Sequence, residues 1–155
     1  DSRCVADVIG IVTPDGVAYL GDVLMGFPQL AGSKMPTTQF LRLDLESKRS
    51  LHQLQAKCYI IAHKAIFEDI HELIDANLRC LEGKVQDVLA ALRGTPTRGE
   101  WLIAFCEAHR MHARSERSFA ILEYGFNSVV TYLEETGQVI SRRVNGNRRY
   151  KRRLK

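Results

Sequence analysis

A change in the spacing of apolar residues near residue 65 most constrains how this chain can fold. Before it, apolar residues come in short runs rich in β-branched side chains, at 8–12, 17–20 and 58–62. After it, they recur at helical spacing. The change predicts an α+β fold in two domains, a sheet with one helix over residues 1–65 and a helical module over residues 66–155.

The first domain is expected to open with a β-hairpin. Two apolar runs flank the turn Thr13-Pro14-Asp15-Gly16, which has the composition of a tight turn. A loop over 25–43 and a helix over about 45–56 are predicted to follow. The run at 58–62 is apolar throughout, as expected of a central strand covered on both faces.

The second domain is expected to hold three helices and a terminal hairpin. The helices are predicted over about 66–92, from the capping box Thr97–Glu100 to about residue 111, and over about 117–136. Asn145-Gly146 between two short runs predicts the hairpin. This order is typical of a winged-helix-like module.

Basic residues are concentrated at the C-terminal end. Residues 141–155 hold eight Lys or Arg and no acid, whereas the other 140 residues hold 14 basic and 18 acidic ones. A cationic hairpin could contact phosphate, so nucleic-acid binding or protein interaction by a winged-helix module is the alternative function. The acids Glu123, Glu134 and Glu135 argue against inserting the preceding helix into a groove. The candidate phosphate contacts are Arg142, Arg143, Arg148, Arg149, Lys151, Arg152 and Arg153.

The cysteines and the apolar runs indicate a cytoplasmic protein. The cysteines at 4, 58, 80 and 106 form no C-x-x-C pair, and we interpret them as free thiols in a reducing compartment. No secretory signal is expected, and no run is long enough to span a membrane.

Asp22 and His63 are the candidate metal ligands. Each follows directly on an apolar strand, and ligand sites gather where loops leave the ends of strands. A carboxylate and an imidazole suit zinc, manganese or iron. Two further sets include histidines: His109 and His112 at helical spacing, and His71 beside Glu72 and Asp75 on a polar helix face. Both sets are expected to be ordinary surface residues.

The segment Thr13–Asp22 resembles the metallo-β-lactamase superfamily, in which a strand of the form DGVLFTGD ends in a metal-bridging aspartate. Ser50-Leu51 and the strand ending at His63 resemble the next elements of that family, with Ala62 where the family has glycine. The helical part, including Tyr132-Leu133 and Gly137-Gln138-Val139, resembles the extension of its glyoxalase-II-like and endoribonuclease-like branches.

This resemblance implies the C-terminal half of an αββα sandwich followed by the helical module. In the family, the residue equivalent to Asp22 bridges two metal ions, and the residue equivalent to His63 binds one of them. The metal ions lower the pKa of a bound water, which then attacks the substrate. The family's H-x-H-x-D-H motif is absent from these 155 residues. We therefore expect the chain to be a portion of a metal-dependent hydrolase, inactive by itself, with no catalytic residue of its own and no tightly bound metal.

The substrate stays open, because thioesters, lactones, phosphodiesters and β-lactams are all cleaved within the superfamily. The resemblance also implies that a second sheet covers the sheet predicted here. A sheet left uncovered would expose a broad apolar face. We therefore expect the chain to form homo-oligomers through that face.

Overall fold

The structure, a computed structural model, describes residues 10–62 and 65–153. Its contacts divide the chain into two compact units. The first unit comprises Asp1–Ser33 with Leu45–Cys80, and the second comprises Lys34–Asp44 with Leu81–Lys155. The two units are described separately below.

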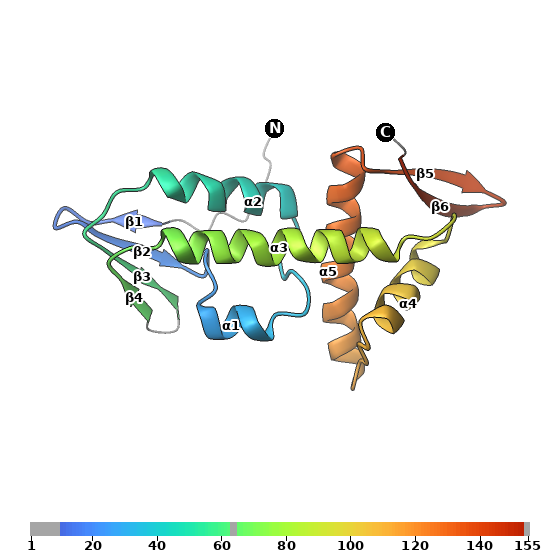
Figure 1. The fold of residues 1–155 in the computed structure, drawn as a ribbon, viewed down its shortest axis with the longest axis horizontal. Helices are drawn as coiled ribbons and strands as arrows, with labels where there is room; N and C mark the ends of the chain where they lie inside the picture. Colours follow the sequence, from blue (N-terminus) through green and yellow to red (C-terminus); the bar gives the residue numbers. More distant parts are fainter. Residues whose placement is uncertain (1–9, 63–64, 154–155) are drawn as a thin grey trace. The chain divides into compact units, whose positions relative to one another are not determined.

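The first unit is built on a four-stranded sheet in the order β1-β2-β3-β4 (Figure 1). The central strands β2 and β3 are parallel, and each edge strand is antiparallel to its neighbour. The sheet contains the predicted hairpin as β1 and β2, and the predicted central strand as β3. The strands are β1 (Ile11–Val12), β2 (Val17–Gly21), β3 (Cys58–Ile61) and β4 (Ala65–Phe67).

The register gives the two faces of the sheet different surroundings. Residues that oppose each other in neighbouring strands share a face. On the inner face, Ala18 and Tyr59 are paired and almost fully buried. On the opposite face lie four apolar residues, which we call the outer row; Ile11, Tyr19 and Ile66 are 60%, 47% and 68% exposed. The outer row is Ile11, Tyr19, Ile60 and Ile66, each opposite the next.

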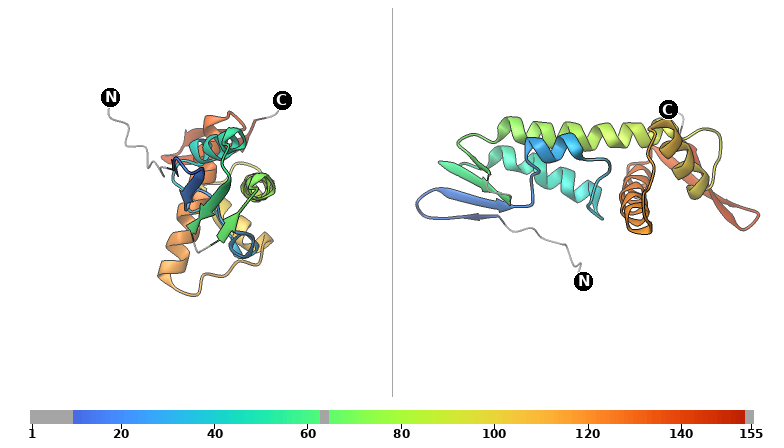
Figure 2. Two further views of the ribbon diagram at one scale, coloured as in Figure 1. Left: turned by 90° about the vertical axis from the view of Figure 1, so that its left-hand side faces the viewer. Right: turned by 90° about the horizontal axis from the view of Figure 1, so that it is seen from below.

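Helices cover the inner face. Helices α1 (Phe27–Gly32) and α3 (His71–Ala91) lie along the same side of the sheet (Figure 2). Ile70, Leu73 and Ile74, at the start of α3, pack with the inner-face residues in one apolar core. The short helix η1 (Leu51–Gln53) adds Leu51 to this core.

Three predicted elements were wrong or misplaced. The helix predicted from residue 66 begins at His71, because Ala65–Phe67 pair with β3 as strand β4. The loop predicted over 25–43 contains α1. The helix predicted over 45–56 is α2 (Leu41–Ser50), which begins four residues earlier and ends before Leu51.

The second unit holds helices α4 (Arg98–Ala108) and α5 (Glu116–Glu135) and a hairpin of β5 (Val139–Val144) and β6 (Asn147–Arg152). The predicted capping box is confirmed: the Glu100 N–H donates to Thr97 Oγ1 (3.3 Å), and the Thr97 N–H donates to Glu100 Oε2 (2.7 Å). The predicted hairpin is confirmed as well, with both turn residues at positive φ.

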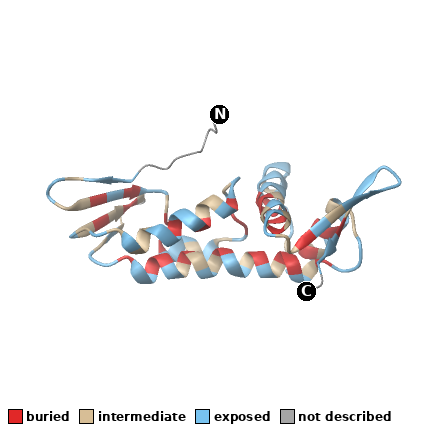
Figure 3. Cartoon of the chain, turned by 90° about the horizontal axis from the view of Figure 1, so that it is seen from above, coloured by how far each residue is buried: buried red, intermediate tan, exposed pale blue. Residues whose placement is uncertain are grey.

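The core of the second unit forms around Trp101. This side chain is fully buried, and its Nε1–H donates to the carbonyl of Val88 (2.9 Å). Its ring meets that of Phe126 edge-on, with centroids 5.4 Å apart. Figure 3 shows that buried residues reach only the base of the hairpin, so its tip is exposed.

The observed architecture is therefore α+β. In the described part of the chain, no helix combines the length and apolar character needed to cross a bilayer.

Replacing Trp101 tests the core of the second unit. We expect Trp101→Ala to lower the free energy of unfolding by about 3–5 kcal/mol, because it leaves a large cavity. Ile103→Ala on the same helix should change it by less than about 0.5 kcal/mol, since Ile103 is 60% exposed. Urea unfolding measures both, and equal effects would contradict this packing.

Candidate functional site

Asp22 stands where β2 ends. Strand β2 stops at Gly21, whose φ of +53° is a conformation that glycine adopts without strain and that turns the chain out of the sheet. The N–H of Val23 donates to the carbonyl of Leu20 (3.2 Å) and closes the turn that contains Asp22. The Asp22 residue is exposed, as a ligand at a strand end would have to be.

The parallel pairing brings the end of β3 to the same edge. Gly21 is the register partner of Ile61, so the two strands end side by side. Ala62 follows Ile61, and the next residue is His63. His63 lies outside the described residues, so its side chain has no described position, and the predicted pairing with Asp22 stays a prediction.

The donors that the structure does describe are too few for a metal site. Within the described ranges, no three His, Cys, Asp or Glu side chains form a group able to hold a metal ion. Catalytic zinc sites take three protein ligands and a water. Asp22 together with His63 would supply two, so these two candidates do not by themselves make a complete catalytic metal site.

Asn77 fixes the segment that follows Asp22. It is fully buried on α3, and its Oδ1 accepts from the N–H of Met25 (2.9 Å). Its Nδ2 donates to the carbonyls of Met25 (2.9 Å) and Leu73 (2.8 Å). The side chain thereby ties the chain three residues beyond Asp22 to α3. Sequence reasoning missed Asn77, although a lone amide within an apolar helical stripe was a usable signal.

Two histidine–aspartate pairs lie near the start of α3. His71 Nδ1 is 2.6 Å from Asp69 Oδ1, and His52 Nε2 is 3.0 Å from Asp75 Oδ1. The two imidazole centroids are 5.4 Å apart. The Asp69 carboxylate also accepts from the backbone N–H of His71 (2.8 Å), the first residue of α3.

This geometry shifts two pKa values. The side-chain hydrogen bond to Asp69 raises the pKa of His71 from 6.5, and the backbone hydrogen bond from His71 lowers the pKa of Asp69 from 3.8. The raised value stabilises the fold below pH 6.5, and that stabilisation is lost as the pH rises through the folded-state pKa. The lowered value acts above pH 3.8 and is lost in acid, so the pair is strongest between these limits.

His109 and His112 do not share a helix. Helix α4 ends at Ala108, three residues before the predicted end, and His109 is its C-cap. Arg110 then adopts a φ of +50°, which turns the chain away from the helix axis. The helical spacing that would have paired these two histidines is therefore absent, and the His109 ring instead stacks near Phe105, with centroids 4.7 Å apart.

Two of the predicted basic residues form ion pairs with helices, and the others have no ion pair in the described part of the chain. Arg148 forms an ion pair with Glu134 (2.8 Å) and Arg149 with Glu100 (3.2 Å), which tie the hairpin to α5 and α4. The other predicted residues are exposed. They are Arg142, Arg143, Lys151 and Arg152 on the hairpin, with Arg153 directly after it.

Comparisons with known proteins bear on the fold. Neither a protein-family model nor a curated protein matches the sequence. Two solved structures do match: a metallo-beta-lactamase family protein from Thermus thermophilus (TM-score 0.63, 21% identity) and a beta-lactamase domain protein from Burkholderia ambifaria (TM-score 0.67, 15% identity). The matches cover 90% and 93% of this chain but 42% and 44% of those chains. The chain thus has the fold of part of these proteins and spans less than half their length.

Asn77→Ala tests how the turn after Asp22 is held. The substitution leaves the N–H and carbonyl of Met25 without their side-chain partner. Each polar group left unpaired in this way lowers the free energy of unfolding by about 1–3 kcal/mol. We expect a loss of unfolding free energy in that range or above, together with faster hydrogen exchange of the Met25 amide. Arg79→Ala, an exposed change on the same helix, is the control and should alter neither quantity.

Proposed function

We propose that this chain is the part of a metal-dependent hydrolase of the metallo-β-lactamase superfamily that contributes Asp22 and His63 to the metal site. The observation that carries the proposal is the position of Asp22 at the end of β2, beside the end of the parallel strand that leads to His63. The likeness in fold to the two solved structures supports the same assignment. The resemblance of Thr13–Asp22 to the family's aspartate strand agrees with it.

The remaining ligands would come from residues outside this sequence. Zinc is the metal that the donor set favours, with manganese and iron as the alternatives. A carboxylate and an imidazole alone leave too many coordination positions open to hold such a metal tightly. No hydrolytic step therefore follows for this chain by itself, and its activity would depend on the completed site.

The topology of the second unit supports a winged-helix-like module, in the part of the chain that resembles the extension of the glyoxalase-II-like and endoribonuclease-like branches. An isolated bridge pairs Thr97 with Arg149 of β6. It stands between α3 and α4, so the chain order is helix, bridge, two helices, then the hairpin. A short strand that follows the first helix and pairs with the last strand is the arrangement expected of a winged helix.

Manganese titration tests the proposed pairing of Asp22 with His63. We expect weak binding, with paramagnetic broadening of amide NMR signals centred on residues 22–24 and 61–65. Asp22→Asn and His63→Gln should each remove the broadening, because both side chains share one ion. Asp15→Asn, which removes a carboxylate at the other end of β2, is the control and should leave it intact. Broadening centred elsewhere, or tight stoichiometric zinc binding in calorimetry, would refute the assignment.

The outer row supports self-association. The central strands are parallel, and parallel strands are usually covered on both faces, yet the outer row is exposed. The exposed face of four strands spaced about 4.8 Å apart has an area well below the roughly 800 Å² that each partner buries in a stable complex. We therefore propose a weak homo-oligomer in which the outer rows of two copies meet.

Sedimentation equilibrium tests this contact. Association should increase with concentration, and Ile66→Lys should abolish it by placing like charges in the interface. Ile103→Lys, at a residue of similar exposure on α4, should leave association unchanged. A clean monomer at high concentration would contradict the proposal.

A further inference from the structure

The β5–β6 hairpin places like charges directly opposite each other. Its register pairs Arg142 with Arg149 and Arg143 with Arg148. Like charges in directly opposed positions destabilise an antiparallel pair. Two such pairs in one short hairpin therefore act against its own folding.

One member of each pair is neutralised by a helix. Arg148 Nη2 is 2.8 Å from Glu134 Oε1, and its Nε–H donates to Ser141 Oγ (2.8 Å). Arg149 Nη1 is 3.2 Å from Glu100 Oε2 and donates to the carbonyl of Thr95 (3.0 Å). These two contacts attach the hairpin to the helices and place a carboxylate beside each arginine.

Four other cations on the hairpin remain exposed. Within the described ranges, none of them has an acidic partner in the structure. We call these four the wing cations: Arg142, Arg143, Lys151 and Arg152.

The wing cations occupy both faces of the hairpin. Because opposed residues share a face, Arg142 lies on the face of Lys151, and Arg143 lies on the face of Arg152. Arg142 and Lys151 are diagonal neighbours, which stand about 7–8 Å apart. A nucleic-acid strand carries one charge about every 3.4 Å along its axis, so both side chains can reach phosphates of one strand.

Charge on both faces decides the kind of ligand. A flat anionic surface such as a membrane would meet one face of the hairpin only. A two-stranded ribbon that enters a groove has phosphates on either side of it. Arginine binds phosphate through two parallel hydrogen bonds, and three of the four wing cations are arginines.

Helix α5 is unsuited to the same contact. Its exposed side carries Glu116, Glu123 and Glu135, whose carboxylates would repel phosphate. Arg117 is the one exposed cation of α5 against these three acids, and Phe119 and Tyr124, both about half exposed, are uncharged. Any contact with a nucleic acid would therefore be made by the hairpin and would involve the phosphate backbone, which carries no sequence information.

We propose that the β5–β6 hairpin binds the phosphate backbone of double-stranded nucleic acid through the four wing cations, without sequence specificity. The proposal depends only on the second unit. It stands or falls independently of the metal site proposed for Asp22 and His63.

Fluorescence anisotropy with a labelled duplex of about 20 base pairs tests the proposal, between about 50 and 200 mM salt. Neutralising four phosphates predicts a slope of log affinity against log salt of about −3.6. The double variant Arg142→Ala/Arg143→Ala should reduce the slope by about half and weaken binding. Its fold should be retained or slightly stabilised, because it removes two opposed positive charges.

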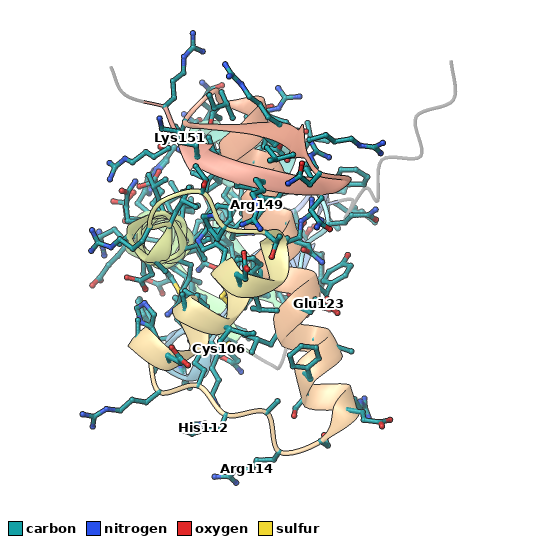
Figure 4. All side chains as sticks on the ribbon, turned by 90° about the vertical axis from the view of Figure 1, so that its right-hand side faces the viewer. Cys106, His112, Arg114, Glu123, Arg149 and Lys151 are labelled. Carbon is teal, nitrogen blue, oxygen red and sulfur yellow. The ribbon has the colours of Figure 1, made fainter. Side chains whose placement is uncertain are left out.

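The matched control is Arg114→Ala/Arg117→Ala, which removes the same charge from exposed residues of the same unit. Arg114 lies in the α4–α5 connection, at the far end of the unit from Lys151 in Figure 4. This control should leave the slope unchanged. Equal losses in both double variants, no salt-dependent binding at the lowest salt, or stronger binding to phosphatidylserine vesicles than to the duplex would overturn the proposal.

Discussion

The parallel pairing of β2 with β3 is the constraint on which the first unit depends. Parallel strands cannot be joined by a tight turn, so the chain must leave Gly21, cross over and return to Cys58. The crossover contains α1, α2 and η1. It brings the ends of both strands to one edge of the sheet, where Asp22 begins its turn. The candidate site is therefore a consequence of topology before it is a matter of individual side chains.

The two units are stabilised in different ways. In the first, an apolar core on one face of the sheet is combined with one buried amide, Asn77, which fixes the segment after Asp22. In the second, aromatic packing around Trp101 is joined by ion pairs that attach the hairpin to α4 and α5. The first arrangement orients a strand end. The second presents the basic β5–β6 hairpin to solvent, with one arginine of each opposed pair neutralised by a helix.

What the sequence predicted correctly was local. The capping box at Thr97 and Glu100 lies within four residues, and the hairpin turn at Asn145-Gly146 needs only residues that tolerate positive φ. Asp22 was predicted to follow a strand, and it does. These signals are complete within a few residues, so no distant contact was needed to interpret them.

The errors depended on contacts between distant residues. Ile66 and Phe67 fit a helix or a strand equally well, and only their pairing with β3 decides for the strand. Helix α1 was hidden among turn-forming residues, although Pro28 lies in its first turn, where proline is tolerated. Asn77 finds its partner Met25 52 positions earlier in the chain, which no local pattern indicates.

The central claim is that the ends of β2 and β3 bring Asp22 and His63 together. Intramolecular cross-linking tests it directly, with the native cysteines replaced by serine and a short bismaleimide applied to Asp22→Cys/His63→Cys. We expect this pair to cross-link within one chain, and Asp22→Cys/Lys57→Cys, which uses the other end of β3, not to do so. Cross-linking of the second pair without the first would contradict the parallel arrangement and the site built on it.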